Sequence, residues 1–375
     1  MRVAVVGPTY PFRGGISHYT TLMVQYLRER HDVLFVSYLK QYPQFLFPGR
    51  SQLDDSGKPI QTECERDLSF ANPISWRKAA RRIVDYDPDA VIFSWVNPAL
   101  AVQFRVVTGY VKRRMPSVRI LFWCHNVAQH ERLPMSRAMT RFAFRHGDRF
   151  VVTGQESRRN LLQMRPGSNV SVSYLPSLDV FTGEPPGPGV RQELGLDSEA
   201  PVALYFGFVR AYKGLVHLLD AMPEAVARVP RLHLLVVGEF WDDRSAYEEI
   251  VRRHRLQDSV TIIDRYVPNE EVASYFKCAD LVVLPYVTAT GSGIVQVAYG
   301  FGKPVLTTTV GSLPEVVDDG ETGYLVRPGD PAAIASAMVD FFASGRGDQF
   351  ARNIEAARGR FSWDNFIRTV ELQTP

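Results

Sequence analysis

Short runs of apolar, mostly β-branched residues recur along the chain, separated by longer segments in which apolar residues recur every three or four positions. The short runs predict buried strands, and the longer segments, for example 16–28 and 98–112, predict amphipathic helices. Regular alternation of the two indicates parallel sheets covered by helices. The expected strands are 3–6, 33–36, 90–93, 120–123 and 150–152 in the first half, and 202–206, 233–237, 260–263, 281–284 and 305–308 in the second.

The alternation stops at residues 182–189, which read Thr-Gly-Glu-Pro-Pro-Gly-Pro-Gly. Prolines and glycines at this density support neither a helix nor a central strand. The pattern then starts again, and 375 residues are about two to three times the usual size of a domain. We therefore predict an α/β protein with two doubly wound domains, at 1–182 and 190–360, joined near Pro185 and facing each other across a cleft.

The first loop of interest follows the first strand and contains Gly14-Gly15 directly before a predicted helix. A glycine pair lets the backbone approach a ligand closely and leaves the first N–H groups of the helix open to an anion. An ordinary strand–helix turn is the alternative. No Gly-x-Gly-x-x-Gly follows this strand, which disfavours an oxidoreductase that binds a dinucleotide.

A second loop follows the first strand of the second half and carries Arg210 and Lys213 between Gly207 and Gly214. Two fixed positive charges can clamp a diphosphate and stabilise the charge that develops on a leaving phosphate. A solvated pair of side chains is the alternative. The position at the carboxyl end of a strand favours the phosphate site, because ligands of open α/β sheets bind at that edge.

A third loop, at 285–294, contains Thr-Gly-Ser-Gly-Ile at 290–294 and leads into another helix. Its glycines and hydroxyl groups are typical of a helix start that binds an anion. Both loops follow strands of the same predicted sheet. Two anion-binding loops in one domain predict a nucleotide diphosphate as the ligand.

Histidines follow one strand of the first domain, in the sequence His125-Asn126-Val-Ala-Gln-His130-Glu131. Histidine can hydrogen-bond a substrate hydroxyl or move a proton near neutral pH. A structural role is the alternative for each residue. Their position after a buried strand places them at the edge where a ligand is expected.

Taken together, these landmarks resemble retaining glycosyltransferases of family 4, the glycosyl transferases group 1, which have the GT-B fold. The resemblance extends over nearly the whole chain. It implies a hexosyltransferase with two Rossmann-like domains, and a closing helix at about 361–375 that packs back onto the N-terminal domain. The segments that carry the resemblance are Gly14-Gly15, 206–214, 279–285, 302–305, 311–317 and 319–326.

The resemblance also implies roles for individual residues. Arg210 and Lys213 fall on the diphosphate-binding pair, Gly15 on a glycine that approaches the phosphates from the other side, and His125 on a histidine near the donor sugar. Retention in this fold is generally ascribed to front-face attack assisted by the leaving phosphate, so no enzymatic nucleophile is needed. We assign His125, Arg210 and Lys213 as catalytic; Gly14, Gly15, Gly207, Arg210, Lys213, Tyr266, Thr290, Gly291, Ser292, Gly293 and Ile294 as donor-binding; and Arg13, His18, Asn126 and His130 as acceptor-side.

One departure from the family pattern concerns two glutamates that usually lie eight positions apart before the Gly-x-Pro-Val turn. Aligned on that turn, the chain has Ala289 and Val297 at these positions. Either the donor is held through Thr290, Ser292 and backbone N–H groups, or the protein is a catalytically silent scaffold that binds nucleotide sugars. The persistence of Arg210 and Lys213 favours the enzyme.

An acidic run at 85–89, Asp-Tyr-Asp-Pro-Asp, resembles the metal site of the other major glycosyltransferase fold. It precedes the strand at 90–93, and so lies at the amino end of that strand, away from the expected ligand edge. We interpret it as an exposed helix–strand turn. We expect no required metal and no cofactor other than the donor substrate.

The charge distribution suggests a further partner. The formal net charge is only +3, but residues 1–180 contain 25 Lys and Arg against 14 Asp and Glu, and residues 101–170 contain 13 against 3. No nucleic-acid-reading module interleaves these charges with stacking aromatics, so we do not expect nucleic acid binding. An anionic membrane surface fits better, and a solvated basic face is the alternative. The densest point is Lys112-Arg113-Arg114.

Aromatic residues and prolines are concentrated at 38–50, with basic residues near both ends. Such a segment could seat a lipid tail or enter the membrane interface, or it could pack against its own domain. Three widely spaced cysteines fit a reducing compartment, and the sequence predicts neither a signal peptide nor a membrane span. We therefore expect a cytoplasmic enzyme, either free or peripheral on the cytoplasmic membrane face.

Overall fold

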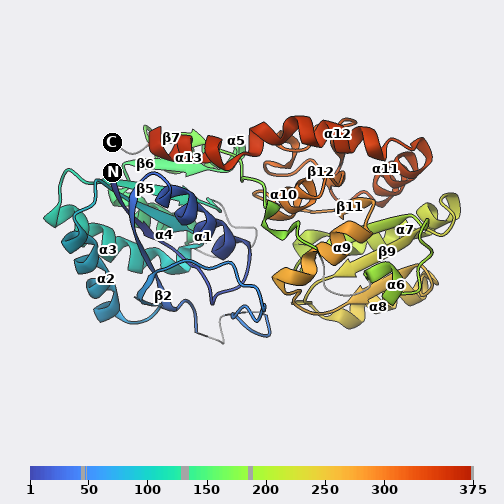
Figure 1. Ribbon diagram of the computed structural model, residues 1–375, viewed down its shortest axis with the longest axis horizontal. Helices are drawn as coiled ribbons and strands as arrows, with labels where there is room; N and C mark the ends of the chain where they lie inside the picture. Colours follow the sequence, from blue (N-terminus) through green and yellow to red (C-terminus); the bar gives the residue numbers. More distant parts are fainter. Residues whose placement is uncertain (44–46, 48, 128–134, 185–188, 373–375) are drawn as a thin grey trace. The chain divides into compact units, whose positions relative to one another are not determined.

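The structure is a computed structural model that describes residues 1–43, 47, 49–127, 135–184 and 189–372. The chain forms two compact units, drawn in Figure 1. The linker predicted near Pro185 lies outside the described residues. Unit 1 consists of Met1–Asp55, Pro59–Leu175 and the segment from Ser362 onward, and unit 2 consists of Ser56–Lys58 and Pro176–Phe361.

The sheet of unit 1 has seven parallel strands in the order β3-β2-β1-β4-β5-β6-β7. Five of them contain the apolar runs expected from the sequence. The other two, β3 and β7, are edge strands with the polar sequences Glu-Arg-Asp-Leu-Ser and Asn-Val-Ser-Val, which hydrophobic patterning does not reveal. The strands are β1 (Arg2–Val6), β2 (Asp32–Lys40), β3 (Glu65–Ser69), β4 (Ala90–Trp95), β5 (Arg119–Cys124), β6 (Arg149–Val152) and β7 (Asn169–Val172).

The helices of unit 1 cover both faces of this sheet. The segment expected as a helix from residue 98 begins with a 3₁₀ turn, because Asn97 caps a turn that starts at Pro98. The helices are α1 (Gly15–Arg28), α2 (Pro73–Tyr86), η2 (Pro98–Leu100), α3 (Ala101–Arg114), α4 (Ser136–Ala143), η3 (Phe144–His146), α5 (Gln155–Met164) and α13 (Trp363–Leu372).

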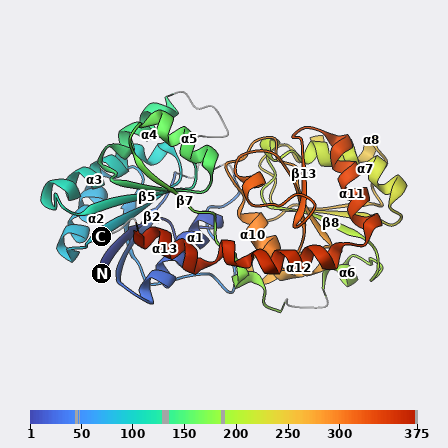
Figure 2. The same ribbon diagram turned by 90° about the horizontal axis from the view of Figure 1, so that it is seen from above.

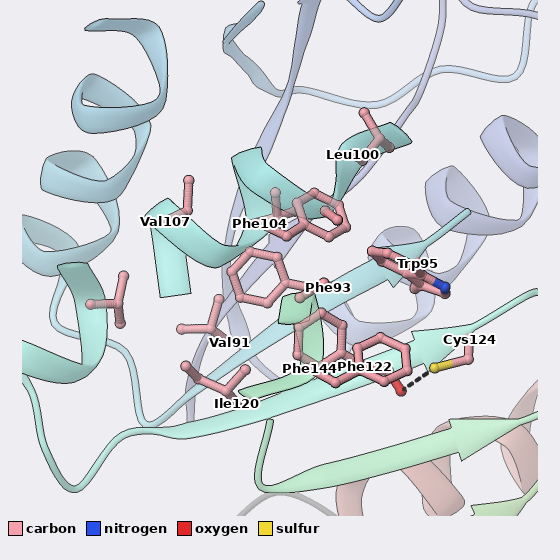
Figure 3. Close-up of a cluster of buried hydrophobic side chains, with 14 of the residues drawn as sticks. Val91, Phe93, Trp95, Leu100, Phe104, Val107, Ile120, Phe122, Cys124 and Phe144 are labelled. Atoms are coloured by element: carbon pink, nitrogen blue, oxygen red, sulfur yellow. Dashed lines mark hydrogen bonds between the residues drawn. The ribbon is translucent and has the colours of Figure 1, made fainter. Parts of the chain in front are cut away.

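One face of the sheet packs against α2, α3 and η3 through a cluster of aromatic side chains, shown in Figure 3. The ring centre of Phe93 in β4 lies 5.3 Å from that of Phe104 in α3. Phe122 in β5 lies 4.8 Å from Phe144, measured in the same way. All four side chains are fully buried. This cluster fixes β4 and β5, the strands whose carboxyl ends carry Ser94 and His125.

The last helix, α13, lies beside α1 on the other face of the same sheet, as Figure 2 shows. Trp363 stacks on Tyr26 of α1 with ring centres 4.9 Å apart, and Phe366 lies 4.7 Å from Trp123 of β5. The end of the chain therefore completes the core of unit 1.

The aromatic segment at 38–50 is partly described. Tyr38 is buried in β2. Tyr42 packs against Phe70 with ring centres 5.8 Å apart, and its hydroxyl accepts a hydrogen bond of 2.8 Å from Asn97. These two tyrosines thus pack against their own domain, while residues 44–46 and 48 lie outside the described part of the chain.

Unit 2 contains a six-stranded parallel sheet in the order β10-β9-β8-β11-β12-β13. The strands are β8 (Val202–Phe206), β9 (His233–Val237), β10 (Val260–Ile263), β11 (Leu281–Leu284), β12 (Val305–Thr308) and β13 (Gly323–Val326). The helices are η4 (Asp179–Phe181), α6 (Val190–Glu193), η5 (Ala211–Lys213), α7 (Leu215–Arg228), α8 (Arg244–Arg253), η6 (Asn269–Glu271), α9 (Val272–Cys278), α10 (Gly293–Gly300), η7 (Leu313–Glu315), α11 (Pro331–Ser344), α12 (Gly347–Ala357) and η8 (Arg358–Phe361).

The predicted fold class is confirmed, because both sheets are parallel and doubly wound. The strand order reverses between β1 and β4 in unit 1, and between β8 and β11 in unit 2. Ligands of such sheets bind at the carboxyl ends of the strands where the order reverses. The glycine-containing loops after β1, β8 and β11 all begin at these two points. Among the described residues, no helix has both the length and the apolar character needed to cross a bilayer.

Candidate functional site

The loop after β8 places two cationic side chains over aromatic rings. The turn η5 is closed by hydrogen bonds from the N–H of Lys213 to the carbonyl of Arg210, 2.9 Å, and from Gly214 to Ala211, 3.0 Å. The guanidinium carbon of Arg210 lies 5.5 Å from the ring centre of Trp241, and Nζ of Lys213 lies 5.6 Å from that of Tyr286. A cation over a ring face is attracted by the electrons of the ring. The rings therefore help to hold both charges at the carboxyl edge.

The ammonium group of Lys213 is poorly solvated. Burial, reinforced by the nearby charge of Arg210, lowers the pKa of Lys213 to about 8. A positive charge that has lost hydration and lies beside a second one gains more than an exposed lysine from a bound anion. This loop can therefore bind a phosphate strongly.

The loops after β8 and β11 are in direct contact. Gly214 has a φ of 71°, and a Cβ atom there would lie 1.9 Å from the carbonyl oxygen of Pro285. The N–H of Val287 donates to the carbonyl of Tyr212 over 2.8 Å. Only glycine permits this approach, so Gly214 sets the spacing between the two loops.

The glycine-rich loop leads into α10, whose first N–H groups face the same edge. Ser292 caps the helix by accepting a hydrogen bond of 3.2 Å from the N–H of Ile294. The Ser292 hydroxyl also lies 3.3 Å from the hydroxyl of Tyr286, the residue whose ring is next to Lys213. The start of a helix carries partial positive charge. Lys213 and the start of α10 are thus linked through Tyr286.

The structure of unit 2 brings together several of the residues predicted to bind the donor. A Cβ on Gly207 would lie 3.2 Å from Nζ of Lys213 and 3.8 Å from Cδ1 of Ile294. The N–H of Ser312 binds the carbonyl of Thr290 over 3.0 Å, which ties the glycine-rich loop to the loop after β12. Tyr266 follows β10, two strands away from β8 in the sheet.

The positions of the two absent glutamates lie in this region. Val297 is buried in α10. The carbonyl of Ala289 packs against Gly311, where a Cβ would lie 2.1 Å from that oxygen. A different carboxylate, Glu239, follows β9 and is 1% exposed, and its backbone carbonyl accepts a 3.0 Å hydrogen bond from the N–H of Val209.

Sequence reasoning did not identify three residues at this edge. Trp241 and Tyr286 support the two cations, and Glu239 is a buried residue two positions before Trp241 in the loop after β9. The sequence Val-Gly-Glu-Phe-Trp at 237–241 carries a usable signal. It is a glycine directly after a buried strand, followed by a charged and an aromatic residue.

In unit 1, His125 lies at the carboxyl end of β5 and is 8% exposed. Its Nε2 atom lies 3.0 Å from the hydroxyl oxygen of Ser94 in β4, and that oxygen lies 3.2 Å from the hydroxyl of Thr20 in α1. Burial lowers the pKa of His125 to about 3. The imidazole is therefore neutral at neutral pH, and can donate or accept a hydrogen bond without carrying charge.

The glycine pair starts α1 as predicted. Gly14 precedes the helix with a φ of 105°, a conformation that favours glycine, and its carbonyl accepts a 3.2 Å hydrogen bond from the N–H of His18. A Cβ on Gly15 would meet no atom within 4 Å, so the backbone at the helix start is uncrowded. His18 is buried, with Nε2 3.8 Å from a carboxylate oxygen of Asp54.

Of the three other residues assigned to the acceptor side, the structure describes Arg13 and Asn126. The guanidinium carbon of Arg13 lies 5.5 Å from the ring centre of Phe47. The side-chain amide of Asn126 donates to the carbonyl of Val96 over 3.5 Å. His130 lies outside the described residues.

The acidic run at 85–89 forms the turn between α2 and β4. Asp87 ends α2 with a φ of 53°, and a carboxylate oxygen of Asp89 accepts a 2.8 Å hydrogen bond from the backbone N–H of Arg2. Asp89 thus helps to join the amino ends of two strands. Among the residues that the structure describes, no group of three or more His, Cys, Asp or Glu side chains is arranged to hold a metal ion.

Comparison with known proteins shows which proteins the chain is similar to. Residues 200–344 match the family model of glycosyl transferases group 1. The chain is 30% identical to a D-inositol 3-phosphate glycosyltransferase of Streptomyces coelicolor, over 50% of this chain and 45% of the relative. It is 26% identical to a GDP-mannose-dependent α-(1-6)-phosphatidylinositol monomannoside mannosyltransferase of Mycolicibacterium smegmatis, over 90% of this chain and 87% of the relative.

The D-inositol 3-phosphate glycosyltransferases that the chain matches are aligned over only about half of their own length. Two solved structures share the fold over nearly their whole length. Sucrose-phosphate synthase from Thermosynechococcus elongatus has a TM-score of 0.73 at 19% identity, with 99% of this chain and 98% of the other covered. HepE of Anabaena in complex with UDP has a TM-score of 0.75 at 17% identity, with the same coverage.

Both the loop motifs and the sheet topology of unit 2 lie within the matched region, and each unit has a Rossmann-like sheet. Residues 200–344 thus match the glycosyl transferases group 1, and the two units of the chain have the architecture of the GT-B fold.

Proposed function

We propose that this protein is a retaining glycosyltransferase that moves a sugar from a nucleotide-diphosphate sugar to a lipid-linked or polysaccharide acceptor. One observation carries the proposal. Arg210 and Lys213 lie where the strand order of unit 2 reverses, held over Trp241 and Tyr286, and Tyr286 links Lys213 to the capped start of α10. Two cations and a helix start suit a diphosphate that gains negative charge as the sugar departs.

The names of the relatives support this class of reaction. One relative is named for D-inositol 3-phosphate, and another for GDP-mannose as donor and a phosphatidylinositol mannoside as acceptor. A structural neighbour has been solved with UDP-glucose. We propose that the present chain likewise takes a nucleotide sugar.

In this proposal, His125 acts as a hydrogen-bonding group near the donor sugar. A pKa of about 3 leaves its imidazole neutral, and Ser94 fixes the ring through the 3.0 Å contact with Nε2. A neutral ring can orient a sugar hydroxyl without delivering a proton. The leaving phosphate, held by Arg210 and Lys213, then assists front-face attack by the acceptor.

The donor sugar is proposed to be held without the usual glutamate pair. Thr290 and Ser292, with the N–H groups at the start of α10, supply the donors and acceptors that remain in that loop. The absence of carboxylates at Ala289 and Val297 also favours a second candidate function, a catalytically silent protein that binds nucleotide sugars.

A donor panel separates the two functions. We expect the protein to bind one class of nucleotide sugar, and to hydrolyse it slowly or transfer the sugar when an acceptor is supplied. Arg210→Gln and Lys213→Gln should each lower the rate by one to two orders of magnitude. This loss corresponds to about 1.5–3 kcal/mol, the contribution of one charge-assisted hydrogen bond. Arg253→Gln, an exposed residue in the last turn of α8, is the matched control. Binding without turnover for every donor and acceptor would favour the silent protein.

We further propose that the enzyme acts at the cytoplasmic face of an anionic membrane. In α3, Lys112 is committed to Asp148 at 2.8 Å, whereas Arg113 and Arg114 are exposed in the last turn. Anionic lipid attracts such residues by about 1 kcal/mol each. Co-sedimentation with phosphatidylglycerol vesicles at low salt should fall when Arg113 and Arg114 are changed together to Ala. Binding that is absent, or unaffected by these changes, would remove the membrane from the proposal.

We also propose that transfer needs no metal ion. Arg210 and Lys213 can supply the positive charge that a cation supplies to diphosphates in other enzymes. The rate should therefore be unchanged by an excess of EDTA. A rate that is lost with EDTA and restored by a divalent cation would refute this part of the proposal.

A further inference from the structure

Unit 1 contains a cavity of about 560 Å³. It lies at the edge of the sheet opposite to the one that carries Gly14 and His125. It is formed by the last turn of α3, the first residues of β5, β6 and β7, and the loop before β7. These are the amino ends of the strands, whereas Gly14 and His125 follow the carboxyl ends of β1 and β5. The side chains that matter for its chemistry are Lys112, Arg119, Asp148, Arg149, Arg165 and Ser168.

Four basic residues and one acidic residue line this cavity. The acid already has partners, since Asp148 forms an ion pair with Nζ of Lys112 at 2.8 Å and accepts a hydrogen bond of 2.8 Å from the N–H of Ile120. Arg165 donates to the carbonyls of Phe144 and Gly147, at 2.7 and 2.8 Å. Carbonyl oxygens are neutral, and Asp148, which interacts electrostatically with Arg165, is already ion-paired with Lys112. The charge of Arg165 is therefore only partly balanced.

In the described part of the chain, Arg149, unlike Arg165, is not held by hydrogen bonds to backbone carbonyls. It is the first residue of β6, and within the described residues its guanidinium group makes no hydrogen bond or ion pair. Arg119 opens the neighbouring strand β5, which pairs with β6 in parallel. Five N–H donors of Arg149 are thus available at a cavity wall that carries other positive charges.

The surroundings of the cavity are positive as well. The pKa of His146 is lowered by burial and by the charges of Arg105, Arg145 and Lys112, against a smaller opposing effect of Asp148. The positive charges near this end of the sheet therefore repel a further proton. An anion entering the cavity would reduce this repulsion.

We propose that this cavity is a binding site for a phosphate group carried by a polar molecule, with Arg149 and Arg165 as the charged contacts. Guanidinium groups bind phosphate oxygens in pairs. A cavity of about 560 Å³ exceeds what inorganic phosphate needs and leaves room for a polyol or a headgroup beside it. The hydroxyls of Ser117 and Ser168 can bind that part. The site is independent of the proposed donor loops, which belong to unit 2.

The phosphate group could be carried by a soluble phosphomonoester or by a phospholipid. The test is a calorimetric titration with glycerol 3-phosphate, and in parallel with vesicles of phosphatidylglycerol. Both titrations use protein carrying Arg210→Gln and Lys213→Gln, so that the loops of unit 2 cannot supply the signal. The test variant adds Arg149→Gln, and the control variant adds Arg158→Gln, an exposed arginine of α5 outside the cavity lining.

We expect saturable binding of one phosphate compound per chain. Arg149→Gln should weaken it about tenfold or more, because it removes charge-assisted hydrogen bonds, whereas Arg158→Gln should change it less than twofold. Binding of glycerol 3-phosphate identifies a soluble ligand, and binding of vesicles alone identifies a lipid headgroup. Arg149→Lys, which keeps the charge but loses the paired donors, should have an affinity between those of the wild-type residue and Arg149→Gln. Thermal unfolding of each variant verifies the fold.

Three results would overturn the proposal. The first is no saturable binding of either probe. The second is equal weakening by Arg149→Gln and Arg158→Gln, which would indicate general attraction of anions to a basic surface. The third is unchanged binding in Arg149→Gln. None of these results bears on glycosyl transfer, which is measured separately with intact Arg210 and Lys213.

Discussion

The ammonium group of Lys213 lies 5.6 Å from the centre of the Tyr286 ring, in the loop where the strand order of unit 2 reverses. Burial and the charge of Arg210 lower the pKa of this lysine to about 8. The group is therefore close to losing its charge under mildly alkaline conditions. A bound diphosphate would favour the charged form and raise that pKa again.

The first prediction concerns two quantities that change with pH in opposite directions. They are the affinity for a nucleoside diphosphate and the stability of the ligand-free protein. Affinity for a nucleoside diphosphate such as UDP should fall as the pH rises above about 8, where Lys213 loses its proton in the free protein. An unfolded lysine titrates near about 10.4, so the charged form is disfavoured on folding. The stability of the ligand-free protein should therefore gain a contribution as the pH rises from 8 towards 10.4.

Titration calorimetry with UDP at pH 7 and pH 9.5 measures the first trend, and thermal unfolding over the same range measures the second. In Lys213→Arg the positive charge persists throughout, so both trends should diminish. If UDP affinity depends on pH equally in the wild type and in Lys213→Arg, another group is titrating.

A second prediction concerns the contact between the two loops. Gly214→Ala places a Cβ 1.9 Å from the carbonyl oxygen of Pro285 and forces alanine into a φ of 71°. We expect a loss of about 2–4 kcal/mol from strain and displacement of the loop, together with loss of donor binding. Gly345→Ala is the control, because its φ is 63° and a Cβ there meets no atom within 4 Å. Urea unfolding should show about 1 kcal/mol or less for the control. Equal losses would mean that the loops do not touch as described.

A third prediction tests the neutral state of His125. Its folded pKa of about 3 is below that of an unfolded histidine. The unfolded chain therefore binds the extra proton, and stability is lost as the pH falls from 6.5 towards 3. Between pH 7 and pH 5 this residue should account for about 2 kcal/mol of the loss. His125→Gln should lose correspondingly less in urea unfolding at the two pH values.

Ser94 provides a separate check on the same site. Ser94→Ala removes the hydroxyl between Nε2 of His125 and Thr20, and should cost about 1–3 kcal/mol of stability because buried polar atoms lose a partner. For His125 itself, the contrary result would be a stability in urea that falls between pH 7 and pH 5 as much in His125→Gln as in the wild type. The buried histidine would then not be neutral as described.

The fourth prediction separates helix capping from donor binding. Ser292→Ala removes the cap of α10 and should cost about 1 kcal/mol of stability. It should also weaken nucleotide-sugar binding, since the capped helix start is part of the proposed site. Asp330→Ala removes the cap of α11, which follows the edge strand β13, and should cost a similar amount without affecting donor binding. Binding that falls equally in both variants would indicate a general loss of stability.

The sequence was sufficient to predict the architecture because the central strands are almost entirely apolar. Three strands were not predicted. β3 and β7 are edge strands, which tolerate polar residues such as Glu65 and Asn169, and β13 is an edge strand of four residues that begins at Gly323. The addition of β3 and β7 widens the unit 1 sheet without altering the position where its order reverses.

The candidate site was predictable where glycine or charge marks a loop, as at Gly14, Gly207, Arg210 and Lys213. Trp241 was not predictable, because its role depends on a contact with Arg210 across more than thirty residues of chain. The neutral state of His125 also arises from burial that only the packed structure reveals.

The position of α13 has a consequence for biosynthesis. Most of unit 1 precedes unit 2 in the chain, but unit 1 also needs α13, which follows unit 2 and whose Trp363 and Phe366 cover Tyr26 and Trp123. Unit 2 is almost continuous in the chain and can fold as soon as it has emerged. Until α13 has been synthesised, the nascent unit 1 exposes an aromatic surface. Removal of α13 would therefore damage the unit that precedes unit 2 in the chain.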